Sequence, residues 1–275
     1  MSLGRNFSAE NPARTPSPET LAEILTDRME IDELIEKSYR LFEDYTIGKT
    51  LQVCKACCVT DEEEAELVNT PLRTTSSNLL WTAYYESARS YSDRELWEMK
   101  HFLPRVLELV NNFDFPCHST EIVFIRLDLD KPEKWTKEEM QLLTDFSALY
   151  FKKCLTFYPY SPDGDSIATY LVMFGIGHFN LKPILTEWEN ADNIESILQF
   201  KDFVLNDIEY KVQDPYKLTN AFSEAFVDEA VINWLNDKTV KDKFSTKIEN
   251  EIMNNKSLSQ ETIAELSWTY ELLTK

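Results

Sequence analysis

The chain has 275 residues, of which 43% are hydrophobic and 12% aromatic, and 48 acidic residues against 28 basic ones give a formal net charge of −20. A chain of this length and composition can bury a sizeable core, which excludes an intrinsically disordered protein. The negative charge disfavours nucleic acids and anionic membranes as partners, because like charges repel. The same charge would attract a basic protein partner, although acidity alone also keeps proteins in solution.

The N-terminal residues indicate neither secretion nor a membrane anchor. Residues 1–18 hold no basic segment followed by an apolar one, so they do not resemble a signal peptide. They are polar and contain Pro12, Pro16 and Pro18, which predicts a flexible tail ahead of the folded body. No apolar run in the chain approaches the roughly 20 residues that a membrane-spanning helix needs. Together with the odd number of five cysteines, these features predict a cytoplasmic protein with reduced thiols.

The composition and the apolar spacing predict an all-α fold. Only five glycines occur, whereas dinucleotide-binding folds and phosphate-binding loops need glycine at turns and at close backbone approaches. From Leu21 to Phe42, apolar residues recur mostly every three or four positions, as on the buried face of a helix. Three later segments begin with Ser or Thr followed three residues on by Glu, which is the pattern of a capped helix start. These segments are Thr60–Glu63, Ser92–Glu95 and Thr136–Glu139.

Two segments of the first half depart from a regular helical pattern. Pro104 lies within a helical stretch, and because proline cannot donate a backbone hydrogen bond we expect a break or kink near His101–Pro104. Residues 121–127 have the composition of a strand, but their neighbours are helical. We therefore expect a short buried helix there.

The second half begins with the most turn-rich segment of the body, residues 158–164, which predicts a candidate subdomain boundary near 159–165. Helical patterns follow it at residues 166–178, 182–190, 193–210, 217–236, 239–254 and 259–273. Helices of similar length joined by short polar turns indicate an antiparallel helical array, built as helix hairpins or as an irregular solenoid. We expect residues 19–275 to form a single helical domain.

The segment with the most unusual chemistry holds three of the five cysteines, Cys54, Cys57 and Cys58. Two cysteines at C-x2-C spacing can hold one side of a tetrahedral zinc ion, and a second pair of ligands would have to come from elsewhere. Three thiols could also serve redox or nucleophilic chemistry, but no strand-rich unit surrounds them as in thioredoxin-like proteins. Their favoured interpretation is packing of free thiols. Ligands that the fold could add to zinc are Cys58 itself, Cys117, His118 and His101.

A second candidate site is a binding site for a carboxylate or phosphate formed by Arg73, His101 and Arg105, with Arg126 nearby. Arginine presents a planar fork of donors that suits such groups. The alternative is internal, with these arginines pairing with Glu95, Glu108 or Glu121 and holding helices together, and it is the interpretation that we favour. The chain contains no nucleophile elbow, metalloprotease pair or phosphate-loop lysine motif, so no catalytic residue is assigned and an enzyme is not the favoured reading.

Two stretches resemble segments of a family of uncharacterised bacterial helical proteins. The first runs from Cys54-x-x-Cys57-Cys58 to Pro71-Leu72-Arg73, and the second is His101-Phe102-Leu103-Pro104-Arg105-Val106-Leu107-Glu108-Leu109. The resemblance covers about residues 40–130. It implies a bacterial cytoplasmic protein, and it carries no activity and no functional residue over to this chain.

These observations leave three hypotheses for the function. The first is a protein-binding module, of the inhibitor or immunity type, whose acidic surface attracts a basic partner. The second is a metal-dependent or thiol-dependent enzyme built on Cys54, Cys57 and Cys58. The third is a scaffold whose concave surface binds a peptide, and a strong salt dependence of binding would favour the first over the third.

Overall fold

The structure is a computed structural model that describes residues 18–275, with the backbone alone for residues 18–25, 27 and 28. It confirms the all-α fold class. The α-helices are α1 (Pro18–Leu41), α2 (Asp61–Asn69), α3 (Ser77–Leu80), α4 (Asp93–Asn111), α5 (Lys137–Cys154), α6 (Ile167–Ile176), α7 (Leu181–Asn190), α8 (Ile194–Asp202), α9 (Ala225–Asn236), α10 (Lys238–Asn254) and α11 (Gln260–Thr274). The flexible tail predicted for residues 1–18 lies outside the described residues, apart from Pro18, where α1 begins.

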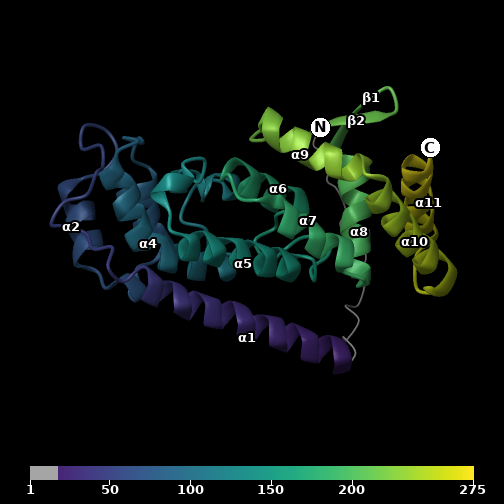
Figure 1. The fold of residues 1–275 in the computed structure, drawn as a ribbon, viewed down its shortest axis with the longest axis horizontal. Helices are drawn as coiled ribbons and strands as arrows, with labels where there is room; N and C mark the ends of the chain where they lie inside the picture. The colour runs from purple at the N-terminus through teal and green to yellow at the C-terminus, as the bar shows by residue number, and fades with distance from the viewer. Residues whose placement is uncertain (1–17) are drawn as a thin grey trace, which may run out of the picture.

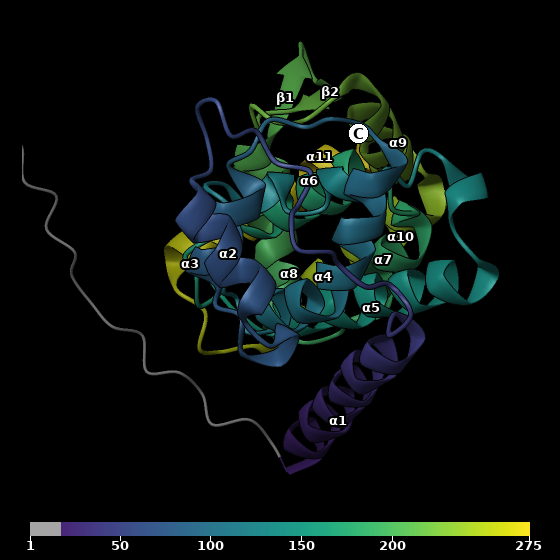
Figure 2. The same ribbon diagram turned by 90° about the vertical axis from the view of Figure 1, so that its left-hand side faces the viewer.

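Several helices pack against helices that are not their neighbours in the chain, including α1 and the pair of α5 and α7. Helix α1 slants along the outside of the body and packs against both α5 and α4 (Figures 1 and 2). Above α5 lie α6 and α7, while α10 and α11 pack side by side at the C-terminal end (Figure 1). The buried apolar side chains form one cluster that runs from Ile31 in α1 to Leu273 in α11.

Helix α6 lies at the centre of this cluster, and all ten of its residues are buried. Helix α9 approaches α6 closely at Gly175, because a Cβ atom added there would lie 2.6 Å from a methyl group of Val227. The turn at residues 158–164 precedes α6 and contains a cis peptide bond at Tyr158–Pro159 and a positive φ at Gly164. Core residues from both sides of this turn belong to the same cluster.

The capped helix starts that the sequence predicts are present at all three positions. Thr60 and Thr136 form reciprocal capping boxes with Glu63 and Glu139. Ser92 also caps its helix by accepting the Glu95 backbone N–H group. The Glu95 carboxylate does not return to Ser92, however, and instead accepts the N–H group of Tyr91.

Two local predictions are wrong. Helix α4 continues through Pro104 without a break, since most of its residues are buried and packing outweighs the lost hydrogen bond. Residues 208–218 form an antiparallel hairpin of β1 (Ile208–Lys211) and β2 (Asp214–Leu218), where helices were expected to extend to residue 210 and to begin at residue 217. Pro215 is incompatible with a helix interior, and Ile208, Tyr210 and Val212 alternate as strand residues do. By contrast, the short buried helix expected at residues 121–127 is present as two 3₁₀ helices, Thr120–Ile122 and Ile125–Leu127.

Candidate functional site

The three clustered cysteines lie in a tight turn of residues 54–58 between α1 and α2. The Cys54 carbonyl oxygen accepts hydrogen bonds from the backbone N–H groups of Cys58, at 3.3 Å, and Val59, at 3.1 Å, which close the chain on itself. The Cys57 side chain is exposed and those of Cys54 and Cys58 are half-buried. The turn therefore exposes Cys57 to solvent, whereas Cys58 also packs against the apolar core.

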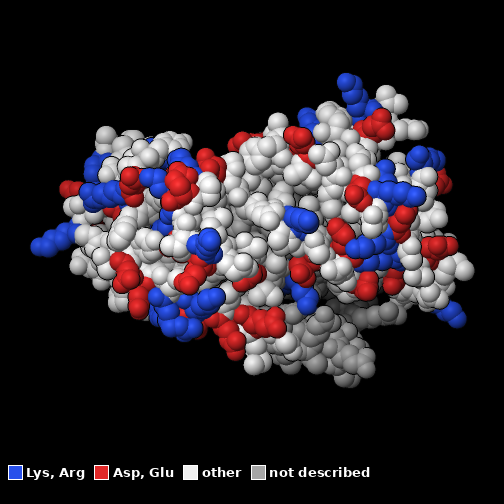
Figure 3. Space-filling model, in the orientation of Figure 1, with Lys and Arg blue, Asp and Glu red and all other residues white. Residues whose placement is uncertain are grey.

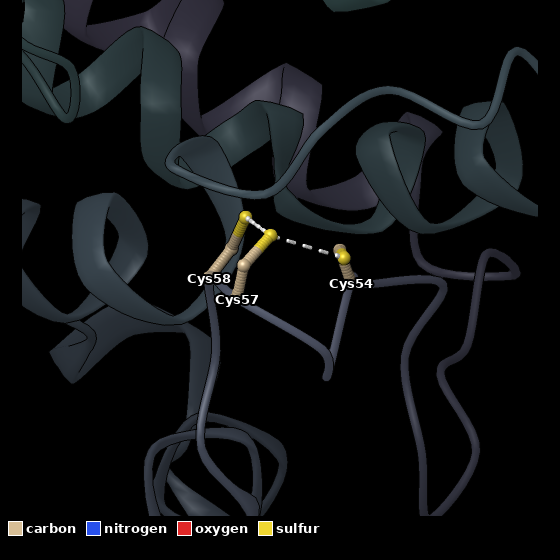
Figure 4. A group of neighbouring side chains, drawn as sticks. All are labelled: Cys54, Cys57 and Cys58. Atoms are coloured by element: carbon tan, nitrogen blue, oxygen red, sulfur yellow. Dashed lines mark hydrogen bonds between the residues drawn. The ribbon is translucent and has the colours of Figure 1, made fainter.

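The three sulfur atoms lie close enough together to share one metal ion. The Cys57 Sγ atom is 3.5 Å from that of Cys54 and 3.0 Å from that of Cys58, and all three lie within 4.8 Å of one another. Figure 4 shows the Cys57 and Cys58 side chains side by side, with Cys54 facing them across the turn. Tetrahedral coordination with Zn–S bonds of about 2.3 Å places sulfur atoms about 3.8 Å apart. Small side-chain rotations would bring the observed sulfurs to that spacing.

The backbone leading into this turn is held in place by buried side chains from elsewhere in the chain. The Leu51 N–H group donates to Glu64 Oε1 at 2.7 Å, and the Gln52 N–H group donates to Glu98 Oε2 at 2.7 Å. The Cys54 N–H group donates to Ser87 Oγ, also at 2.7 Å. Glu64, Glu98 and Ser87 are all buried. They therefore hold the backbone of the turn from the core side, and its sulfur atoms stay accessible.

The electrostatics of the turn favour ionisation of one thiol first. Hydrogen bonds to the Cys54 sulfur, first from the Ala56 backbone N–H group, then from the Cys57 thiol and the Cys57 backbone N–H group, lower the pKa of Cys54. Hydrogen bonding to Cys58 and Cys54 raises the pKa of Cys57 to about 12. The nearby cation, Lys55, pairs with Glu64 at 2.8 Å and with Asp61 at 3.2 Å. Cys54 therefore ionises more readily than Cys57.

The structure does not bring the other predicted zinc ligands to the turn. Among the side chains that the structure describes, the only group of three or more close ligand side chains is Cys54, Cys57 and Cys58. The Cys117 thiol donates to the Ser119 carbonyl oxygen, and burial raises its pKa to about 12. His118 is exposed, and the His101 Nδ1 atom lies 2.6 Å from the Tyr45 carbonyl oxygen. A metal ion at the turn would have three protein ligands.

Arg73 and Arg105 do lie near each other, but their guanidinium groups bind side chains of this chain. Arg73 forms two hydrogen bonds to Glu36, at 2.7 and 2.8 Å, and its guanidinium carbon lies 3.8 Å from the centre of the Tyr39 ring. Arg105 pairs with Glu108 at 2.7 Å, and Glu108 accepts the Tyr39 hydroxyl group at 2.6 Å.

This set of contacts connects α1 to α4 and gives the arginines the internal role that the sequence favoured. His101 is not part of the set, because its ring is half-buried and bound to the Tyr45 carbonyl. Burial lowers the pKa of His101, which disfavours the cationic form that an anion would need. The predicted anion site of Arg73, His101 and Arg105 is therefore not assembled.

The residues that hold the turn, Glu64, Glu98 and Ser87, were not identified from the sequence. Glu64 ends an acidic run that is typical of an exposed helix start, and Ser87 has no motif around it. The only usable signal is that Glu98 lies on the apolar side of its helix, next to Met99 and Phe102. The contacts join residues 13 to 46 positions apart, which local patterns do not encode.

No family model, curated protein or solved structure matches this chain. The resemblance to bacterial helical proteins stays a prediction, as do the cytoplasmic location and the basic protein partner. Among the described helices, none combines the length and apolar character required to cross a bilayer.

Proposed function

We propose that this protein binds a soft metal ion, with Zn²⁺ as the test case, through the thiolates of Cys54, Cys57 and Cys58. The observation that carries the proposal is the convergence of three sulfur atoms, all within 4.8 Å of one another, on a turn whose backbone is fixed by buried side chains. Thiolates are the ligands that Zn²⁺ and Cu⁺ prefer in proteins. A preformed ligand set also avoids the ordering that a flexible site would need.

Packing explains these thiols less well than metal binding does. A packed thiol is represented in this chain by Cys154, which is fully buried in α5. Cys57 is exposed, and its sulfur contacts the sulfurs of Cys54 and Cys58. Three mutually close thiols at a surface gain little from burial, whereas they gain much from a shared cation that neutralises their thiolates.

Three protein ligands leave one coordination position for water or for a group from outside. Structural zinc sites are closed by four protein ligands, whereas sites that exchange ligands or activate water keep a position open. The geometry thus favours an exchangeable site, suited to metal transfer, metal sensing or binding of a further ligand, over a purely structural one.

The test is a zinc titration of reduced protein, purified without a polyhistidine tag, against a chromophoric chelator. We expect one Zn²⁺ per chain, and sharply weaker binding by the variant Cys57→Ser. The matched control is Cys117→Ser, which changes a half-buried thiol outside the turn and should bind as the wild type does. With Co²⁺ in place of Zn²⁺, thiolate-to-metal charge-transfer bands should appear in the wild type and weaken in Cys57→Ser.

Equal zinc binding by the wild type and by Cys57→Ser would overturn the proposal. So would reduced protein that binds no metal but loses free thiols on mild oxidation, because that result assigns the turn to disulfide chemistry instead.

A further inference from the structure

A second surface feature lies where the end of α1 meets α4 and the start of α5. It is a cavity of about 580 Å³ with an aromatic wall and an acidic rim. Its lining residues are Leu41, Asp44, Tyr45, Trp97, Thr136, Lys137, Glu138 and Glu139. None of the three cysteines of the turn is among them.

The aromatic wall is held in a fixed orientation. The Trp97 side chain is 46% exposed, which is unusual for so large an apolar group. Its Nε1–H group donates to the Thr46 carbonyl oxygen at 2.8 Å, and its ring meets the Tyr45 ring at 63° with the centroids 4.6 Å apart. The ring is therefore positioned before any ligand arrives.

Glu139, one of the lining residues, forms a buried ion pair with Lys100, and the two charges cancel. The Lys100 ammonium group lies 2.9 Å from Glu139 Oε2, 4.1 Å from the centre of the Trp135 ring and 4.9 Å from that of Tyr45. Glu139 also accepts the Tyr45 hydroxyl group at 2.6 Å. The structure thus already places one ammonium group among these aromatic rings and one carboxylate, and the pair leaves no net charge to repel a second cation.

The charge that remains at the rim is negative. Asp44 and Glu138 are exposed carboxylates, and Lys137 is the one basic side chain among the lining residues. Figure 3 shows acidic and basic side chains interspersed over the face of the molecule that is drawn, with no continuous acidic surface. Attraction of a basic partner through the net charge of −20 is unspecific, so specificity needs a local site of this kind.

We infer that this cavity binds the ammonium group of a lysine side chain, free or methylated, on a basic protein partner. A cation over the face of a tryptophan is attracted by the negative charge of the ring face, and aromatic cages recognise methylated ammonium groups in this way. The carboxylates of Asp44 and Glu138 add charge complementarity and disfavour phosphates and other anions. The fixed Trp97 ring lowers the entropic cost of forming the cage.

The experiment is calorimetric titration of the full chain with a short lysine-rich peptide, prepared with unmodified, trimethylated and acetylated lysines. Trp97→Ala should weaken binding of the trimethylated peptide by about tenfold, whereas Trp97→Phe, which keeps an aromatic face, should lose less. The matched control is Trp268→Ala in α11, because Trp268 is 61% exposed and lies outside the cavity. Thermal melts of the variants establish that each is folded.

Acetylation removes the positive charge, so the acetylated peptide should not bind. Three results would overturn the inference: no binding of any peptide by the wild type, equal binding by Trp97→Ala and the wild type, or equal binding of the acetylated and trimethylated peptides.

Discussion

The cysteine turn and the cluster around Arg126 both gather polar groups next to the core, and they differ in where those groups point. In the turn, the buried groups are the ones that hold the backbone, and the thiols are half-buried or, at Cys57, exposed. In the cluster, the charged groups face one another, with side-chain exposures of 1% for Glu95 and 5% for Arg126.

Both carboxylate oxygens of Glu95 and two guanidinium nitrogens of Arg126 form hydrogen bonds within the cluster. Arg126 binds Glu95 at 2.5 Å and donates to the carbonyl oxygens of Tyr85 and Ser87. The second oxygen of Glu95 accepts the backbone N–H groups of Ser90 and Tyr91. Because these charged groups bind one another, the cluster contributes to stability and leaves no group to bind a ligand. The turn, in contrast, keeps its sulfur atoms available to a ligand.

The largest effect that this comparison predicts is on the Arg126 cluster. Arg126→Met would leave the Glu95 carboxylate buried without its main partner, and breaking a buried pair by removing one member costs about 3–5 kcal/mol. The lower end applies, because Arg89 Nε lies 3.5 Å from Glu95 Oε1 and the backbone donors remain. Urea unfolding followed by circular dichroism measures the loss.

The matched control is Arg73→Met, which breaks the exposed pair of Arg73 and Glu36. Both side chains of that pair are 52% exposed, and exposed pairs contribute about 0–1 kcal/mol. Equal losses for the two variants would show that the cluster is not the stabilising centre that its burial indicates.

Asp207 is a half-buried carboxylate with no cation paired to it, so its charge should lower stability where the pairing of Glu95 with Arg126 raises it. Burial first, and then the charge of Asp202, raises the pKa of Asp207 to about 7, whereas an unfolded aspartate titrates near about 4. The stability that the neutral form contributes is fully present below about pH 4 and is lost as the pH rises through about 7. Asp207→Asn should therefore exceed the wild type in stability by about 1–3 kcal/mol at pH 8, by less at pH 5 and by nothing below pH 4.

The measurement is the free energy of unfolding of both proteins in urea at these pH values. Asp214→Asn, at an exposed position of the hairpin, should show no such gain. A difference between Asp207→Asn and the wild type that does not vary with pH would refute the account.

The sequence predicts those features whose information is local. The capping boxes that begin at Thr60 and Thr136 each span four residues, and the three cysteines lie within five residues. Prediction from the sequence fails where contacts between residues far apart in the chain determine the local structure. Helix α4 continues past Pro104 because its buried face packs against the core. The local sequence shows the missing hydrogen bond but not this packing, so it predicts a break.

The side chains that hold the cysteine turn also could not be predicted, because their contacts are distant in the chain. Nothing near Ser87 indicates that it accepts the Cys54 N–H group from 33 positions away. The alternation of Ile208, Tyr210 and Val212 was the local signal for the hairpin, but it spans only one short strand between two helical patterns. The sequence therefore located the thiols and left out the side chains that position them.

Ser87 connects the two regions, and its substitution tests whether holding the turn matters for metal binding. Its Oγ atom accepts the Cys54 N–H group, while its carbonyl oxygen accepts from Arg126. Ser87→Ala removes the first contact and keeps the second, so it should cost about 1 kcal/mol of stability. Because the turn is then less restrained, zinc affinity should fall by about three- to tenfold.

Ser90→Ala is the control for this variant, because Ser90 Oγ binds Glu95 at 3.0 Å and does not contact the turn. It should cost a similar free energy of unfolding without changing zinc affinity. If Ser87→Ala binds zinc as tightly as Ser90→Ala, the turn does not depend on this contact.

The smallest effect is expected for the thiols themselves in metal-free protein. Cys57→Ser changes an exposed side chain outside the core and should alter the free energy of unfolding by less than about 0.5 kcal/mol. Cys154→Ser places a hydroxyl group at a fully buried position and should cost about 1–3 kcal/mol. Adding Zn²⁺ at 100 times its dissociation constant should then stabilise the wild type and Cys154→Ser by about 2.7 kcal/mol and Cys57→Ser hardly at all. A core thiol should thus affect stability without zinc, whereas a metal-binding thiol should affect only the stabilisation that zinc adds. Equal stabilisation of all three proteins by zinc would show that the metal binds elsewhere.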